Sequence, residues 1–206
     1  MWFLNHYYQN QRNKGFLLMD LLIGLAVGSI LFTSICSLFK YCINSSKIAE
    51  EKEDLTLNGR YAIEYMKNEI KSADEIILID KIKGYDEKYS NNFGFVIKQK
   101  IEIKLLKPIN KDKRFENRYI IYYINDCYLR RDSVTQKTER IPEAREFSGS
   151  NTIAEKIKSI DGSHIDFNDK RIIIMLKLCG RWNKSLEFGT EIYVRSPIIN
   201  WGVIIA

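Results

Sequence analysis

The sequence predicts an α+β fold in which one long N-terminal helix leads into a mainly antiparallel β-sheet domain. Two observations carry this prediction. An apolar run from Phe16 to Phe39 continues into a segment whose apolar residues recur every three, four or seven positions as far as Ile77, with no proline before Pro108. From Ile76 onward the pattern changes to short runs of β-branched and aromatic residues separated by Gly, Asn and Asp.

The length and composition fit one modest domain with an N-terminal appendage. The chain has 206 residues, of which 45% are hydrophobic and 28% charged, and its net charge is +6. The positive charges are spread along the chain, which favours a solvated basic surface over binding to DNA or to an anionic surface. We expect four parts, namely residues 1–15, an apolar helix over 16–39, its amphipathic continuation over 40–75, and a β-rich head over 76–206.

The head is expected to consist of short strands joined by polar loops. Loops are predicted at 81–92 and 107–114, and Asn125-Asp126 is predicted as the two-residue turn of a hairpin. The apolar tail 201–206 either adds to a sheet, contacts a neighbouring subunit or packs on its own domain. Strands are predicted over residues 76–79, 93–99, 101–106, 118–124, 127–132, 153–160, 164–167, 171–178 and 186–195.

The apolar run carries one carboxylate that needs an explanation. Asp20 is the only ionisable side chain between Phe16 and Phe39, a run long enough to cross a bilayer as a helix. A carboxylate at mid-bilayer costs about 2.5–3.5 kcal/mol. A cleaved secretory signal would be shorter, and a plain signal anchor does not explain the acid. Asp20 either snorkels toward the headgroups or pairs with a positive charge made elsewhere.

The junction before this run resembles that of a known superfamily. Lys14-Gly15, followed by Phe16 and then by Asp20, resembles the leader junction of type IV pilins and pseudopilins. The resemblance implies that a prepilin peptidase cuts between Gly15 and Phe16, removes residues 1–15, and that the new terminus at Phe16 is N-methylated. The family acid is nearly always glutamate, so Asp20 keeps the charge but shortens its reach. Asp20 would then pair with the terminal amine of a neighbouring subunit in a low-dielectric filament core.

Two further segments resemble a subgroup of this superfamily. Residues 58–70 are similar to the helix of PilW-type minor pilins and J-type pseudopilins, and Tyr122-Tyr123 followed by residues 129–131 is similar to their central hairpin. The resemblance implies a pilin-like fold and a structural subunit of a type IV pilus, a type II secretion pseudopilus or a DNA-uptake filament. Its partners would be other pilins or pseudopilins, with an assembly platform and an ATPase acting indirectly.

The expected location follows from the same segment. The chain would cross the cytoplasmic membrane once, with its N-terminus inside and its head outside, and would then join a cell-surface or periplasmic filament. Gly24 and Gly28 stand four positions apart in the apolar run, a spacing that lets helices approach closely but is common by chance. The alternative is an uncleaved, single-pass membrane-anchored sensor or binding domain, displayed alone.

We expect no enzymatic activity, cofactor or metal site. No phosphate loop or hydrolase motif occurs, and the cysteines lack zinc-ligand spacing. Glu64 and Glu69 are expected on a solvated helix face, and His164 at an exposed turn. Cys127 and Cys179 are a conceivable disulfide if the head lies outside the cell, with two independent buried thiols as the alternative.

One group of strand residues raises the possibility of nucleic-acid contact. Aromatic and basic side chains alternate there, a combination that binds single-stranded DNA when it lies on a surface. Alternation in a strand more commonly means that one face lies in the core and the other in water, which is the interpretation we favour. The residues are Tyr119, Tyr122, Tyr123, Arg118, Arg130 and Arg131.

Overall fold

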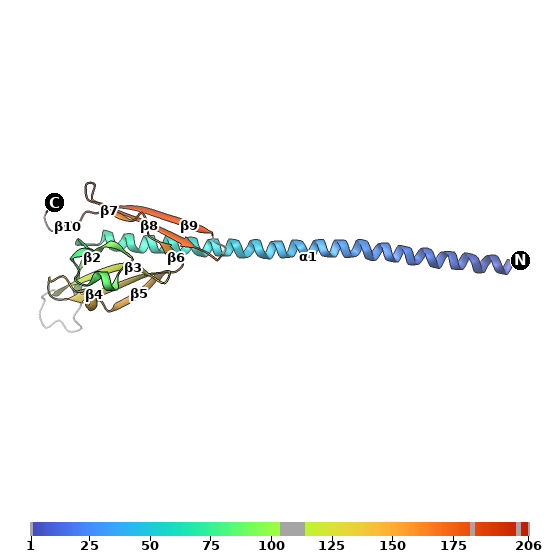
Figure 1. Ribbon diagram of the computed structural model, residues 1–206, viewed down its shortest axis with the longest axis horizontal. Coiled ribbons are helices and arrows are strands. Elements are labelled where there is room, and N and C mark those ends of the chain that lie inside the picture. The colour runs from blue at the N-terminus through green and yellow to red at the C-terminus, as the bar shows by residue number, and fades with distance from the viewer. Residues whose placement is uncertain (1, 104–113, 182–183, 201–202, 206) are drawn as a thin grey trace. The chain divides into compact units, whose positions relative to one another are not determined.

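The computed structural model describes the backbone of residues 2–103, 114–181, 184–200 and 203–205. It divides into two compact units, residues 1–50 and 51–206, which are described separately. The α+β prediction is confirmed, because a long N-terminal helix precedes a mainly antiparallel β domain (Figure 1).

The helical elements are α1 (Trp2–Lys71), η1 (Ile79–Lys81), α2 (Tyr85–Lys88) and η2 (Ala144–Glu146). The strands are β1 (Glu75–Leu78), β2 (Asn92–Ile103), β3 (Arg114–Asn125), β4 (Tyr128–Gln136), β5 (Gly149–Ala154), β6 (Ile157–Ser159), β7 (His164–Asp166), β8 (Arg171–Cys179), β9 (Ser185–Tyr193), β10 (Ile198–Asn200) and β11 (Val203–Ile205).

Helix α1 runs without interruption from Trp2 to Lys71. Its end agrees with the sequence prediction, and in the uncleaved chain the helix also includes residues 2–15, which the prediction had set apart from it. No proline lies in this stretch, and a single glycine such as Gly15 costs a helix only about 1 kcal/mol relative to alanine, which is too little to end it. In the first unit, the described side chains from Leu17 to Lys47 are all exposed.

In the second unit, the last five turns of α1 form a core together with two sheets (Figure 1). Sheet A has the strand order β11-β10-β1-β2-β3-β4-β5, and sheet B has the order β6-β8-β7 with β9 also paired to β8. The helix contributes one apolar face, as its periodicity predicts. Buried core residues of α1 are Leu55, Ala62, Ile63, Met66 and Ile70; those of sheet A include Phe95, Ile97, Ile120 and Leu129, and those of sheet B include Ile172, Ile174, Leu176 and Ile192.

The opposite face of sheet A is covered by a second, smaller core. Residues of η1 and the segment around α2 and η2 pack against it, including Ile79, Tyr89 and Phe147. Strand β3 is therefore buried on both faces, since Tyr119 belongs to the second core and Tyr122 to the first. Short helical pieces thus replace much of the loop predicted over 81–92.

Three strand predictions need correction. The two strands predicted over 93–99 and 101–106 form one strand, β2, as far as Ile103, and residues 104–106 lie outside the described part of the chain. The strand predicted over 153–160 is two strands in different sheets, β5 and β6, because Lys156 between them has a left-handed backbone with φ 62°. The hairpin turn is Asp126-Cys127, not Asn125-Asp126, since Asn125 pairs with Tyr128 and both turn residues have positive φ.

The end of the chain joins the sheet. Strand β10 pairs in parallel with β1, through Ile76 with Ile198, and β11 pairs antiparallel with β10. Of the alternatives for the tail, addition to a sheet is therefore the one that the described residues 203–205 adopt. The parallel β1–β10 pair therefore places the strand that follows α1 beside the C-terminal segment.

Gly59 gives a testable consequence of the packing between α1 and sheet B. A Cβ at this position would lie 2.4 Å from ring carbons of Phe188 in β9, so the ring or the helix has to move. We expect Gly59→Ala to lower the free energy of unfolding by about 1–3 kcal/mol through overpacking, in spite of the higher helix propensity of alanine. Thermal unfolding of the full chain in detergent micelles measures this change.

The first unit supplies matched controls for Gly59. A Cβ at Gly24 or Gly28 would meet no atom within 4 Å, so Gly24→Ala or Gly28→Ala should leave the unfolding of the head unchanged. An equal effect of all three substitutions would contradict the assignment of Gly59 to a close helix–strand contact.

Candidate functional site

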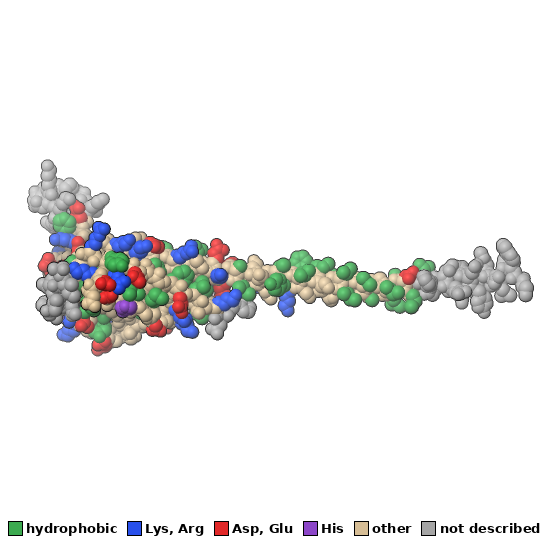
Figure 2. Space-filling view, turned by 90° about the horizontal axis from the view of Figure 1, so that it is seen from above, with side chains coloured by type: hydrophobic (Ala, Val, Ile, Leu, Met, Phe, Trp, Pro, Cys, Tyr) green, Lys and Arg blue, Asp and Glu red, His purple; other side chains and the backbone are tan. Residues whose placement is uncertain are grey.

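The apolar part of α1 is long and apolar enough to cross a membrane. In Figure 2, hydrophobic side chains gather along the helix next to the grey residues at its N-terminal end, with few charged side chains among them. The described apolar side chains from Leu17 to Phe39 are exposed, so the chain does not cover this segment itself. A surface of this kind needs lipid or another apolar helix around it.

The hydroxyl groups in this segment are satisfied within the helix. Ser29 Oγ donates to the carbonyl of Ala26 at 2.8 Å, and Ser34 Oγ donates to that of Ile30 at 2.8 Å. Thr33 Oγ1 donates to the carbonyl of Ser29 at 2.9 Å. Such back-bonding removes the need for water, so these polar residues are compatible with an apolar environment.

Asp20 is the exception in this segment. Its side chain is exposed, and among the described residues it makes no hydrogen bond or ion pair. Gly15 and Phe16 lie in α1, but their surroundings fall outside the residues whose side chains the structure describes, so the cleavage site and the methylated terminus stay predictions. Gly24 and Gly28 are open to their surroundings, because no described atom would lie within 4 Å of a Cβ at either position.

A buried ion pair in the head joins α1 to sheet A. Arg131 in β4 donates from Nη2 to Glu69 Oε1 at 2.8 Å and from Nε to Glu69 Oε2 at 3.0 Å. The Arg131 side chain is 7% exposed and that of Glu69 17%. Tyr122 on the neighbouring strand β3 donates its hydroxyl to the same carboxylate. The two-point geometry fixes the carboxylate relative to the sheet, and each charge offsets the burial cost of the other.

The prediction that Glu69 lies on a solvated helix face is wrong. Glu69 does not lie on a solvated face, whereas Glu64 is exposed and pairs with Lys67 on the same helix at 2.9 Å. Burial and then the charge of Glu69 raise the pKa of the Tyr122 phenol far above its ordinary value. Burial, the largest single effect, lowers the pKa of Arg131, but the hydrogen bonds to Glu69 and the charge of that carboxylate together raise it above its ordinary value.

A second polar cluster lies on the other face of sheet A. Asp132 in β4 is buried and accepts hydrogen bonds from Tyr89 at 2.9 Å and from Tyr123 at 3.2 Å. Lys88 Nζ lies 3.4 Å from the same carboxylate and also donates to the carbonyl of Phe147 at 2.7 Å. Successive residues of β4, Arg131 and Asp132, thus hold opposite charges on opposite faces of one strand.

The possibility of a DNA-binding surface on β3 and β4 is not supported by this arrangement. Tyr119, Tyr122 and Arg131 are buried, so they cannot offer stacking platforms or phosphate contacts on a surface. The favoured interpretation, with one face in the core and the other in water, is wrong for the middle of β3, because its alternate residues lie in two cores on opposite faces.

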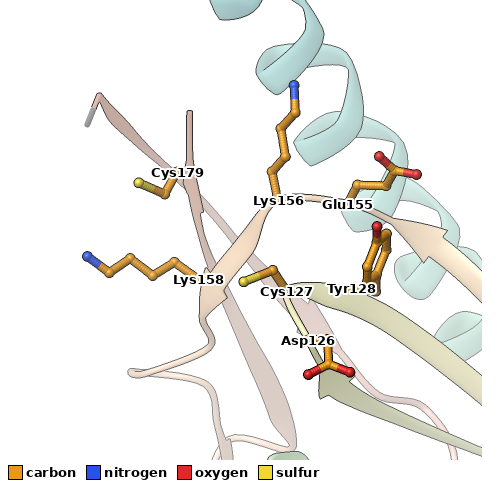
Figure 3. A pocket seen from close by; sticks show the side chains of 7 residues that line it. All are labelled: Asp126, Cys127, Tyr128, Glu155, Lys156, Lys158 and Cys179. Carbon is orange, nitrogen blue, oxygen red and sulfur yellow. The ribbon is translucent and has the colours of Figure 1, made fainter. Parts of the chain in front are cut away.

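A pocket of about 430 Å³ brings the two candidate cysteines together. It is lined by Asp126, Cys127, Tyr128, Glu155, Lys156, Lys158 and Cys179. Figure 3 shows the sulfur atoms of Cys127 and Cys179 on the side of strand β6 toward which the side chain of Lys158 extends. Both thiols are free in the structure.

One peptide group separates the backbones of these cysteines. The N–H of Ile157 donates to the carbonyl of Cys127 at 2.9 Å, and the carbonyl of Lys156 accepts from the N–H of Cys179 at 2.9 Å. Cys127 and Cys179 therefore lie on opposite sides of the Lys156–Ile157 peptide, about two strand spacings or 9.5 Å apart. The Cα atoms of a disulfide lie only about 4.4–6.8 Å apart. The disulfide stays a prediction, and its formation would require these strands to move.

The remaining candidates show no catalytic arrangement within the described residues. His164 is exposed, and its Nδ1 lies 2.9 Å from the carbonyl oxygen of Gly162. In the part of the chain that the structure describes, no group of three His, Cys, Asp or Glu side chains could hold a metal ion. No protein-family model, curated protein or solved structure matches the chain.

The Glu69–Arg131 pair predicts a strong effect of neutralising one partner. Glu69→Gln leaves the Arg131 charge buried without a counterion, so we expect a loss of about 3–5 kcal/mol in the free energy of unfolding. Replacing both charges, as in Glu69→Leu with Arg131→Met, should give a more stable protein than Glu69→Gln alone. Urea unfolding of the full chain in detergent micelles, followed by near-ultraviolet circular dichroism, measures both.

Glu64→Gln is the matched control, because it removes a carboxylate from an exposed pair on the same helix. Such pairs contribute about 0–1 kcal/mol, so this variant should unfold almost as the parent does. Similar losses for Glu64→Gln and Glu69→Gln would show that the buried pair has no special role in stability.

The buried phenols predict a loss of stability at alkaline pH. An unfolded tyrosine ionises near pH 10, whereas the raised pKa values of Tyr122 and Tyr89 keep these groups protonated in the folded state. Their contribution is therefore complete below about pH 10 and falls above it, by about 1.4 kcal/mol per pH unit for each phenol. Tyr122→Phe should reduce that slope.

The measurement is urea unfolding at several pH values between 9 and 11.5, with phenolate absorbance recorded in parallel. Tyr61→Phe is the control, because it removes a phenol that is 57% exposed. A slope that is equally reduced in both variants would contradict a special role for the buried Tyr122 hydroxyl.

Proposed function

We propose that this protein is a structural subunit of a pilin-like filament, in the class of minor pilins and pseudopilins. A prepilin peptidase would cut between Gly15 and Phe16 and release residues 1–15. The apolar helix would hold the subunit in the cytoplasmic membrane, with the head outside, until an assembly platform and its ATPase move it into a filament. The chain would have no enzymatic activity of its own.

The observation that carries this proposal is the state of Asp20. It is the only ionisable side chain between Phe16 and Phe39, and among the described residues it has no partner. A carboxylate kept in an apolar environment needs a cation nearby. Cleavage after Gly15 would create such a cation, the amino group of Phe16, and a neighbouring subunit could bring it to Asp20.

Two further features support the same function. The open faces of Gly24 and Gly28 would let a second helix approach closely without displacing a side chain. The internally satisfied hydroxyls of Ser29 and Ser34 would allow the segment to pass from lipid into a protein core without gaining unpaired donors.

The second candidate function is a membrane-anchored sensor or binding domain that is displayed alone and keeps its N-terminus. It shares the membrane helix and differs at the junction. In that case Asp20 would lie near the headgroups and would be solvated there.

The mature N-terminus decides between these functions. We expect the membrane fraction of the cells that make this protein to contain a chain that begins at Phe16 and carries one methyl group on its terminal nitrogen. Intact-mass and peptide mass spectrometry measure this directly. A chain that still carries residues 1–15 would remove the proposed cation and favour the anchored domain.

Variants at Asp20 test the pairing itself. Asp20→Ala should be cleaved, inserted and folded as the parent is, but its amount in sheared filaments should fall at least tenfold, because the neighbouring amine loses its counterion. Asp20→Glu should be incorporated normally. Ser34→Ala, which changes a polar residue of the same helix, is the control, and normal incorporation of Asp20→Ala would overturn the pairing.

A further inference from the structure

A cleft in the head lies between the last turns of α1 and the end of β9, and the proposed function makes no use of it. Its volume is about 460 Å³. Among the described residues, strand β9 pairs only with β8 and is an edge strand of sheet B, so the cleft lies beside that edge. The lining residues are Lys67, Lys71, Glu191, Ile192, Tyr193 and Arg195.

The charges in this cleft are unbalanced. Lys71 and Arg195 are exposed and form no ion pair among the described residues. Lys67 is paired with Glu64, and Glu191, the one carboxylate among the described lining residues, is 3.2 Å from Arg171 Nη1. The two cations without partners therefore face the cleft with no carboxylate of their own.

An aromatic ring borders the same cleft. Tyr193 is 67% exposed, so its ring is accessible to a ligand in the cleft. The guanidinium carbon of Arg171 lies 6.0 Å from the centre of its ring, so one side of the ring is held by a cation. The tyrosine hydroxyl adds a hydrogen-bond donor to the ammonium and guanidinium donors.

A structural role explains only part of this arrangement. Lys71 lies in the last turn of α1, where a cation interacts favourably with the helix dipole. That effect does not require Arg195 or an exposed tyrosine on the facing strand. Arg195 presents a planar set of donors that matches phosphate oxygens, and lysines supply point charges to the same group.

We propose that this cleft binds a phosphoryl group. Two cations without carboxylate partners in one cleft, Lys71 and Arg195, fit a group that carries more than one negative charge better than they fit a single carboxylate. The cleft is larger than a phosphate ion, so the phosphoryl group belongs either to free phosphate or pyrophosphate or to an ester whose organic part contacts Tyr193. The inference does not depend on filament assembly and holds equally for an anchored binding domain.

Isothermal titration calorimetry on the full chain in neutral detergent micelles tests the site, with inorganic pyrophosphate, glycerol 3-phosphate and thymidine monophosphate as separate probes. We expect saturable binding of at least one probe, weakened at least tenfold in Lys71→Gln with Arg195→Gln and weakened as salt rises. Tyr193→Ser should weaken thymidine monophosphate alone if an aromatic ester is the ligand. Binding of pyrophosphate without either ester assigns the site to free phosphates.

A control double variant removes two positive charges, as Lys71→Gln with Arg195→Gln does, but elsewhere on the head. Lys83→Gln with Lys137→Gln changes two exposed lysines outside the cleft and should leave the affinity within twofold of the parent. The circular dichroism spectrum of each double variant checks that it is folded. Absence of saturable binding by all three probes, or an equal loss in both double variants, would overturn the proposal.

Discussion

The last five turns of α1 must be buried between two sheets at once, and the arrangement of the head follows from this constraint. A helix in that position needs apolar residues toward both sheets, and Leu55, Met66 and Ile70 supply them. It also needs close approach, which Gly59 allows against Phe188 of β9. Apolar contacts are not directional and would tolerate rotation or sliding of the helix. The Glu69–Arg131 pair is directional, and its two-point geometry selects one rotation and one axial position of the helix against β4.

The same pair connects both strands of the β3–β4 hairpin to the helix. Tyr122 on β3 shares the carboxylate of Glu69 with Arg131, while the next residue of β4, Asp132, organises Tyr89 and Tyr123 on the opposite face. Both faces of the hairpin are thus fixed by a buried charge that has hydrogen-bonding partners. Buried ionic groups of this kind are costly when incomplete, so the two clusters disfavour any arrangement that separates their members.

The sequence was informative where a local pattern decides the structure and uninformative where a distant partner does. The periodicity of α1 and the runs of β8 and of the β3–β4 hairpin predicted these elements, because each depends on neighbours in the chain. Glu69 was assigned to solvent because a helical pattern cannot reveal that Arg131, far along the chain, lies opposite it. The division between β5 and β6 was missed because it depends on the backbone of Lys156, a residue that rarely adopts positive φ. The parallel β1–β10 pair was missed because it joins the strand after the helix to the tail of the chain.

Two carboxylates on helix α1, Glu69 and Asp20, differ in whether the described residues supply a partner. Glu69 and Asp20 both lie in α1 among apolar residues, but Glu69 meets Arg131 and Tyr122 within the chain, and Asp20 has no partner among the described residues. A carboxylate without a cation in an apolar segment makes the isolated chain less stable in lipid. Asp20 and its apolar neighbours are exposed and do not belong to either core of the head. In the proposed assembly, a positive charge brought by a second molecule would offset this cost, and that pairing is the physical argument for the proposal.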